Sequence, residues 1–465
     1  MNAPLVLLSE VHKFKETNMN KLILYILAAS MMTGTLMAQV EPGAGQWKTW
    51  VIPSGSALRL PAPPDSEITA TELRWVRECI SQRDQATLAA IHFWDAGSPG
   101  YRWMQLAQQS VVNAGLPAPL QTRALALVAG AISDATIAAW DSKYAYNRSH
   151  PSDLDPAVAP VVAVPRSPSY PSEHAVTAGA AAAVLEYLFP NQATKFADMA
   201  DEAATSRVMA GVAFPSDAFS GLDLGQSIGR AVIAFAQSDG SGQAFNGSYP
   251  PAPGVWSSST PVTPLAGSWK PWVITSPTSF RPGPPPVFGS EVANMQYAGV
   301  KNLSRTNATN HLAWFWQPGF FQPWLQQVDL EIFQNHLDLN APRAARAYAY
   351  ETIAQHDATL ACWDTKYAYL ELRPSQADPT IPTLFANPQH PGYPSGHACA
   401  SGASAAIMSA LFPNDAQLFT SMANDAGAST FDAGIHTQLD VSGGLNLGTQ
   451  VGQQIAARAS ADGAN

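Results

Sequence analysis

The sequence predicts an all-α protein made of two tandem helical-bundle repeats related by internal duplication. Residues 143–225 align with residues 366–448 at a constant offset of 223 positions and without a gap. Apolar residues recur at steps of three and four through long stretches, as on one face of a helix, and no sustained alternation typical of strands occurs. Charged residues form only 13% of the chain and alanine is abundant, a composition typical of closely packed helices.

The N-terminus predicts a secretory signal peptide over residues 1–38, with Met19 as a plausible true start. Lys21 is followed by an apolar run over residues 22–37 and then by Ala38, the expected cleavage site. A membrane anchor is the alternative, but the run is shorter than the roughly 20 residues needed to span a bilayer. We therefore expect an exported protein, periplasmic or extracellular, with no membrane span in the mature chain.

The first repeat is expected over residues 39–238, and it opens with a proline-rich arm. Its predicted helices are 72–94, 121–146, 174–189, 191–209 and 217–236. A Ser-, Gly- and Pro-rich linker follows over residues 239–268. The second repeat, residues 269–465, has its own proline-rich arm and predicted helices 342–370, 397–412, 415–429 and 440–457. Two similar helical bundles are the expected architecture.

The charge balance limits the partners that the protein can bind. The formal net charge is -10, which disfavours nucleic acid and anionic membrane surfaces because both require a basic surface. A local basic pocket for a small anion remains compatible with this charge. The sequence does not indicate an oligomeric state.

Four residues of the second repeat suit the binding of an oxyanion such as phosphate. Lys366 and Arg373 are cations, and an arginine can bind two oxygens at once. The Ser395 hydroxyl and the backbone amide of Gly396 are further donors at the expected start of a helix, where free N–H groups attract anions. Glycine also lets a ligand approach the backbone closely.

Three more residues of that repeat suit catalysis on such an anion. His436 is the candidate nucleophile, and Asp440 lies close enough in sequence to fix its tautomer and raise its basicity. His397 is the candidate acid that protonates the departing alkoxide. The motifs stand at three expected helix junctions that can converge on one pocket.

The first repeat has lost parts of this pattern. At the aligned positions it has His150 for Arg373, Glu173 for Gly396 and Ala213 for His436. Without an imidazole at residue 213 there is no nucleophile, and Glu173 would repel a phosphate. We interpret the first repeat as a structural partner.

The second repeat closely resembles the signature of the type 2 phosphatidic acid phosphatase and vanadium-dependent haloperoxidase superfamily, in a soluble, duplicated form. The matching motifs are Lys366-x6-Arg373-Pro374, then Pro394-Ser395-Gly396-His397, then Ser429-Thr430-x5-His436-x3-Asp440. The resemblance implies that Lys366, Arg373, Ser395 and Gly396 bind phosphate or vanadate and that His397 is an acid–base group. It also implies that His436 forms a phosphohistidine or, where vanadate is bound, is the metal ligand.

One position departs from that signature. The family has an arginine after the serine of the third motif, where this chain has Thr430. A lost charge-assisted contact costs about 1.5–3 kcal/mol, which is roughly tenfold to a hundredfold in binding or rate.

Three functions remain open at this point. The first is a phosphatase-like hydrolase of phosphoric monoesters that needs no cofactor. The second is a vanadate-dependent haloperoxidase that uses hydrogen peroxide and a halide. The third, suggested by Thr430 and the eroded first repeat, is a weakly active oxyanion-binding pseudoenzyme.

The chain has three cysteines, Cys79, Cys362 and Cys399. An odd number in an exported chain leaves at least one thiol unpaired within the monomer. Buried thiols that act as small hydrophobes are one interpretation of Cys362 and Cys399. A disulfide between these two, beside the site, is the other.

Overall fold

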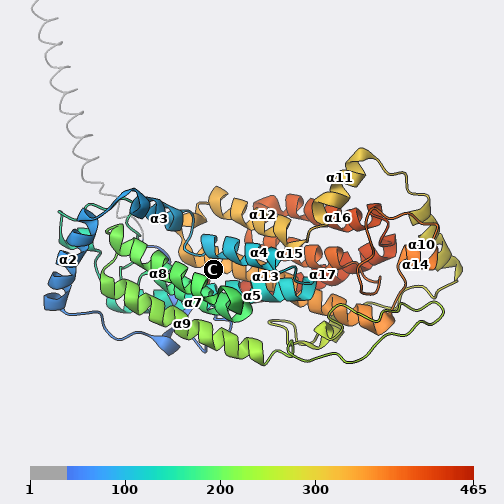
Figure 1. Ribbon diagram of the computed structural model, residues 1–465, viewed down its shortest axis with the longest axis horizontal. Coiled ribbons are helices and arrows are strands. Elements are labelled where there is room, and N and C mark those ends of the chain that lie inside the picture. The colour runs from blue at the N-terminus through green and yellow to red at the C-terminus, as the bar shows by residue number, and fades with distance from the viewer. Residues whose placement is uncertain (1–38, 465) are drawn as a thin grey trace, which may run out of the picture. The chain divides into compact units, whose positions relative to one another are not determined.

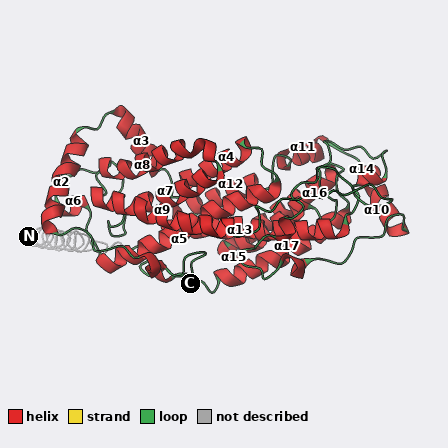
Figure 2. Ribbon diagram, turned by 60° about the horizontal axis from the view of Figure 1, so that its bottom comes forward, coloured by secondary structure: helices red, strands yellow, loops and turns green. Residues whose placement is uncertain are grey.

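Helices form nearly all of the regular structure between residues 39 and 464, the part of the chain that the computed structural model describes. Within that range no β-strand occurs, and strand-like pairing is limited to two isolated bridges between residues 249 and 258. Figure 2 shows these helices and the loops that join them. The all-α prediction is confirmed. The expected signal peptide, residues 1–38, lies outside the described residues.

Both repeats contain the same succession of helices. The first has α2 (Ser66–Ser81), α3 (Gln85–Asp95), α4 (Tyr101–Asn113), α5 (Ala118–Tyr146), α6 (Pro151–Leu154), α7 (Glu173–Leu188), α8 (Ala193–Met209) and α9 (Pro215–Gln237). The second has α10 (Glu291–Lys301), α11 (Asn307–Trp316), α12 (Phe321–Gln334), α13 (Ala341–Tyr369), α14 (Pro374–Ala377), α15 (Gly396–Leu411), α16 (Ala416–Asp432) and α17 (Gln438–Ala459). The duplication therefore extends over the whole helical order.

The single helix predicted over residues 72–94 is wrong, because the structure has two helices, α2 and α3, in this region. The break falls at residues 82–84. The Asp84 side chain accepts a hydrogen bond from the backbone N–H of Thr87 and so caps the start of α3. A capping aspartate stabilises a new helix start, and the apolar periodicity on both sides concealed it.

The long helices α5 and α13 lie side by side at the centre, where Figure 1 shows the first repeat on one side of them and the second on the other. Asp134 on α5 accepts backbone N–H bonds from residues 50, 51 and 52 at 2.7, 2.8 and 3.1 Å. Asp357 on α13 does the same for residues 272, 273 and 274 at 2.9, 2.8 and 3.1 Å. Each N-terminal arm is thus fixed to the central helix of its own repeat.

One described stretch, residues 118–154, is long and apolar enough to cross a membrane by composition alone. Its most apolar window is entirely buried inside the fold. From the sequence we expected no membrane span in the mature chain. The composition of this stretch matches its place in the core, because a helix surrounded by other helices is apolar on every side.

Two helix pairs approach each other to backbone contact. A Cβ atom added to Gly448 on α17 would lie 1.9 Å from the carbonyl oxygen of Cys399 on α15, and one added to Gly225 on α9 would lie 2.1 Å from that of Val176 on α7. Only glycine permits this approach. It brings the N-termini of α15 and α17 together, where the backbone N–H of residue 395 donates to the carbonyl of residue 440 at 2.9 Å.

The segment expected to be a linker, residues 239–268, packs against the second repeat. The backbone N–H of Trp256 donates to the carbonyl of Leu370 at 2.8 Å, and that of Val262 donates to the carbonyl of Gln389 at 2.9 Å. Trp256 is buried. The segment therefore supports two loops that carry residues of the candidate site.

Candidate active site

The end of α13 directs the chain into the site. Leu370 follows the helix with φ of 52°, in the left-handed region, and Asn147 holds the same place after α5 with φ of 50°. This conformation costs a residue with a side chain roughly 1–2 kcal/mol. It turns the backbone sharply, so that Lys366 in the last helical turn and Arg373 beyond it both point inward and are fully buried.

Lys366 is bound by the loop before α15. Its Nζ donates to the carbonyl oxygens of Pro391 at 2.9 Å, Gly392 at 2.8 Å and Pro394. Burial lowers the pKa of Lys366 to about 8. The three donors of the ammonium group are engaged by the protein, so an oxyanion has to share or displace at least one of these carbonyls.

Arg373 lies between the same loop and the candidate nucleophile. Its Nη1 donates to the carbonyl of Ile435 at 2.9 Å and to Nε2 of His436 at 3.1 Å. Its Nη2 contacts Nδ1 of His390 at 3.2 Å, and its Nε donates to the carbonyl of the same residue at 3.3 Å. The guanidinium group is therefore next to the nitrogen that would attack a bound phosphoryl group.

His436 has the tautomer that its expected role requires. Its Nδ1 lies 3.1 Å from Oδ2 of Asp440, which also accepts the backbone N–H of Thr437 at 2.8 Å. A carboxylate can only accept, so Nδ1 carries the proton and Nε2 keeps its lone pair. Burial, together with the charge of Arg373, lowers the pKa of His436 to about 3. The imidazole is therefore neutral and nucleophilic at neutral pH.

Ser395 and Gly396 form the start of α15. The Ser395 hydroxyl caps this helix at the N–H of Ala398 and lies 3.1 Å from the hydroxyl of Thr430. A Cβ atom at Gly396 would meet its nearest neighbour, Trp363, at 3.5 Å, an ordinary contact. Packing would therefore allow a larger residue at this position. Space for a ligand explains better why residue 396 is glycine.

His397 begins α15 beside these residues but bonds elsewhere. Its Nε2 donates to the carbonyl of Trp316 at 3.0 Å, and its ring makes an edge contact with Phe320. Burial lowers the pKa of His397 to about 4. No direct hydrogen bond joins its ring to Lys366, Arg373 or His436 among the contacts of the described chain. The ring is neutral at neutral pH, so donating a proton from Nδ1 requires a nearby dianion that raises its pKa.

Two site residues were not found from the sequence. The His390 ring packs against Trp363, with centroids 4.8 Å apart and planes tilted by 45°, and it contacts Arg373. Glu371 lies two residues before Arg373, and burial together with the charge of Asp440 raises the pKa of its carboxyl well above the usual value. Both positions carry different chemistry in the first repeat, Ser167 and Arg148. That difference at aligned positions was the available signal.

Two of the three cysteines lie beside the candidate site. Cys362 and Cys399 are buried free thiols, so the structure has no disulfide between them. The Cys362 Sγ lies 3.8 Å from the carbonyl oxygen of Pro394, one of the carbonyls that bind Lys366. These thiols form part of the wall behind the lysine.

In the first repeat, an imidazole replaces a guanidinium group with little change in backbone contacts. Nδ1 of His150 lies 2.7 Å from the carbonyl of Val212, and Nε2 lies 2.8 Å from that of Ser167. These two carbonyls align with those of Ile435 and His390, which Arg373 contacts. His150 therefore preserves the local fold.

The first repeat also contains a carboxylate where an anion would bind. Lys143 Nζ lies 2.9 Å from Oε2 of Glu173, which also accepts from the Ser167 hydroxyl at 2.8 Å. Burial acts to raise the pKa of Glu173, but Lys143 and its other neighbours outweigh it and lower the pKa to about 2. Arg207 pairs with Asp95 at 2.6 Å. The remaining cavity is only about 10 Å³.

The second repeat has donors of the type that vanadate requires. Among the described residues no group of three or more His, Cys, Asp or Glu side chains could hold a metal ion. Vanadate differs from a bare metal ion because it brings its own oxygens, so it needs one nitrogen ligand and several hydrogen-bond donors. His436 Nε2 would be the ligand, and Lys366, Arg373, Ser395 and Gly396 would be the donors.

Comparisons with known proteins match both repeats to one family. The family model described as the PAP2 superfamily matches residues 123–240 and 347–458, one stretch in each repeat. No curated protein matches the sequence.

Solved structures share the fold at low sequence identity. A bacterial vanadium-dependent iodoperoxidase is 18% identical, with a TM-score of 0.63 over 77% of this chain and 96% of that one. The holo and apo forms of a bacterial vanadium-dependent chloroperoxidase are each 14% identical, with TM-scores of 0.53 over 74% of this chain and 92% and 94% of theirs.

Proposed function

We propose, from the premise that this chain belongs to the PAP2 superfamily, that it hydrolyses phosphoric monoesters through a phosphohistidine at His436. One observation carries the proposal. His436 is held by Asp440 at 3.1 Å with Nδ1 protonated, so its Nε2 lone pair lies beside the guanidinium group of Arg373. A nucleophile next to a cationic donor is what transfer of a phosphoryl group requires.

The reaction would use residues already in place. The phosphate dianion would be bound by Arg373, Lys366 and the N-terminus of α15, and it would displace part of their present contacts. His436 Nε2 would attack phosphorus in line with the leaving oxygen. The dianion would raise the pKa of His397, which could then donate from Nδ1 to the leaving alkoxide and later take a proton from the attacking water.

Purified protein incubated with p-nitrophenyl phosphate tests this function. We expect release of p-nitrophenol by the wild-type protein and a loss of at least about a thousandfold in the His436→Ala variant. A second readout is the phosphohistidine intermediate itself, which is acid-labile and can be trapped by rapid quench. Equal rates for both proteins would reject His436 as the nucleophile.

A second candidate function is oxidation of a halide by hydrogen peroxide with bound vanadate. It is supported by the fold shared with bacterial vanadium-dependent iodo- and chloroperoxidases. Vanadate would supply peroxide activation, while the same side chains bind its oxygens. Adding vanadate, bromide or iodide and peroxide to the purified protein tests it. Vanadium in stoichiometric amount, with halide oxidation and no phosphatase activity, would favour this function over the first.

A third candidate is oxyanion binding with little turnover. It is supported by Thr430 in place of arginine and by the three carbonyl groups that already bind Lys366. Calorimetry with inorganic phosphate would distinguish it, because tight binding without activity in either assay is its specific outcome.

We also propose that the mature protein is exported and acts on small phosphorylated molecules, or on halide and peroxide, outside the cytoplasm. The apolar run after Lys21 and the small residue Ala38 support export. N-terminal sequencing of the protein from periplasmic or culture fractions would test it. A mature protein that begins near residue 39 is the expected result.

A further inference from the structure

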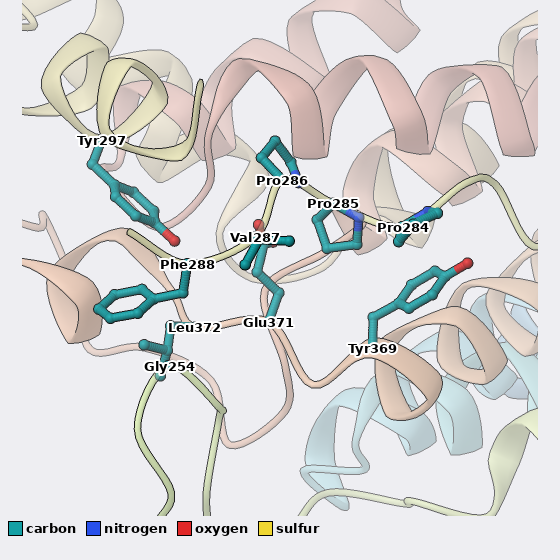
Figure 3. Close-up of a pocket in the computed structure, with 10 residues that line it drawn as sticks. All are labelled: Gly254, Pro284, Pro285, Pro286, Val287, Phe288, Tyr297, Tyr369, Glu371 and Leu372. Carbon is teal, nitrogen blue, oxygen red and sulfur yellow. The ribbon is translucent and has the colours of Figure 1, made fainter. Parts of the chain in front are cut away.

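A cavity of about 160 Å³ lies where the end of α13 faces the proline-rich arm of the second repeat. In Figure 3 the Glu371 side chain rises between Tyr297 and Tyr369 toward the proline segment of residues 284–286. The Tyr369 hydroxyl donates to the carbonyl of Pro282 at 2.8 Å and so fixes the arm beside the cavity. A single water requires only roughly 10–15 Å³, so this cavity can hold a small molecule.

The walls of the cavity combine one carboxyl group with aromatic rings. Among the described residues that line it, Glu371 alone has a carboxyl, amine or guanidinium group. Its Oε2 is buried and has no hydrogen-bond partner. The rings of Tyr297, Tyr369 and Phe288 also line the cavity, and the faces of such rings attract cations. A buried acceptor next to aromatic rings suits a cation that carries N–H donors.

The first repeat has a cation of its own at the corresponding place. Arg148 aligns with Glu371, and its guanidinium group donates to Glu72 at 2.8 Å and to Asp217 at 2.6 Å. The same group lies over the ring of Phe214, 4.1 Å from the centroid. This position of the fold therefore accommodates a buried guanidinium group between carboxylates and an aromatic ring.

The partner of Arg148 on the neighbouring helix is replaced by an aromatic ring in the second repeat. Glu72 is the seventh residue after Asp65, the N-cap of α2, and Tyr297 is the seventh after Ser290, the N-cap of α10. Tyr297 lines the cavity. The second repeat thus has groups that attract a cation on both sides, but its described lining residues include no cation.

The cavity reaches the protein surface. Val287 and Phe288 line it, and their side chains are 78% and 46% exposed. The formal net charge of the chain is -10, which favours the approach of cations over anions. A small cation in solution can therefore enter past these two residues.

We propose that this cavity binds a small organic cation with N–H donors, of the guanidinium or alkylammonium class, where the first repeat has the guanidinium group of Arg148. The cation would donate to Oε2 of Glu371 and lie against the ring of Tyr297. A carboxyl oxygen accepts from an N–H donor in either protonation state, so the cation can bind whether Glu371 begins neutral or ionised. None of the residues predicted to bind the oxyanion lines the cavity, so this binding does not depend on the function proposed above.

Calorimetry with methylguanidinium and with methylurea tests the proposal, because the two molecules have the same shape and differ in charge. We expect methylguanidinium to bind the wild-type protein at one site per chain with a Kd of about 1 mM. Methylurea should bind at least about tenfold more weakly, since aromatic faces and a carboxylate favour a cation. Equal affinities, or no detectable binding of methylguanidinium, would overturn the proposal.

Variants of Glu371 show whether the cation binds in this cavity. Glu371→Leu removes the acceptor and should weaken methylguanidinium binding by at least about tenfold. Glu371→Arg introduces the residue of the first repeat and should abolish binding, because its own guanidinium group occupies the cavity. Glu78→Leu, on the exposed face of α2, is the control for binding to surface carboxylates and should bind as wild type does.

Tyr297→Leu tests the site without changing the carboxyl group. It removes one ring and should weaken methylguanidinium binding by about threefold or more. Circular dichroism melts establish that each variant is folded, and the melts and calorimetry involve no turnover. Wild-type affinity in the folded Glu371→Leu and Tyr297→Leu variants, or an equal loss in Glu78→Leu, would place the cation elsewhere and overturn the proposal.

Discussion

The two repeats share one backbone frame and differ in the side chains at its centre. His150 contacts the two carbonyls that align with those bound by Arg373, so the loops keep their arrangement with either residue. Glu173, at the position of Gly396, bonds to Lys143 in the place where an anion would bind. The shared fold therefore requires a buried donor for these carbonyls, whereas the lysine is paired with a carboxylate in the first repeat and with backbone carbonyls alone in the second. Catalysis additionally requires a histidine and space for a ligand.

The largest expected effect is a loss of phosphatase activity when a histidine of the second repeat is replaced, but not when one of the first repeat is. His436→Ala removes the nucleophile and should lower phosphatase kcat by at least about a thousandfold. Its control is His174→Ala in the first repeat, at the position that aligns with His397; this variant should retain activity within about twofold because residue 213 provides no nucleophile there. Steady-state assays with p-nitrophenyl phosphate measure both. Comparable losses would show that both repeats contribute to catalysis.

Arg148 should be essential for stability. It lies between the buried carboxylates of Asp217 and Glu72, at 2.6 and 2.8 Å. Arg148→Met would leave both without a cation and should lower the free energy of unfolding by about 3–5 kcal/mol. The control is Arg74→Met on the exposed face of α2, where the expected change is under about 0.5 kcal/mol. Denaturant melts measure both, and an equal small change would contradict the structural role of this ion pair.

Restoring the missing arginine should raise the activity of the second repeat. In the first repeat an arginine stands at the position of Thr430, and Arg207 is held there by Asp95 at 2.6 Å. One more charge-assisted contact should raise kcat/KM by about tenfold or more. Thr430→Gln adds similar bulk without charge and should not raise it. An unchanged rate in the arginine variant would show that this contact does not limit the site.

Removing the internal carboxylate should partly restore anion binding in the first repeat. Glu173→Gly frees Lys143, and we expect one additional phosphate per chain with a Kd of about 1 mM. Glu173→Gln still fills the space and should add none. Calorimetry in a His436→Ala background measures both without turnover. Unchanged stoichiometry in the glycine variant would mean that the first repeat no longer binds an anion.

The helices and the positions of the motifs could be predicted because they depend on local patterns. Apolar periodicity and the 223-residue offset indicate the helical repeats. The alignment also predicted Lys366, Arg373 and His436 as candidate site residues of the second repeat. The break before α3 was missed because a side-chain cap at Asp84 interrupts the backbone without interrupting the apolar pattern.

The amino-acid sequence alone determined the helical duplication, and it predicted which repeat holds the candidate nucleophile and the candidate donors around it. Only the tertiary structure decided which acceptors those donors bind. The three carbonyls around Lys366 and the contact of His390 with Arg373 join the end of α13 to the loop before α15. Their distances depend on how closely the helices pack, and spacing along the chain does not encode them.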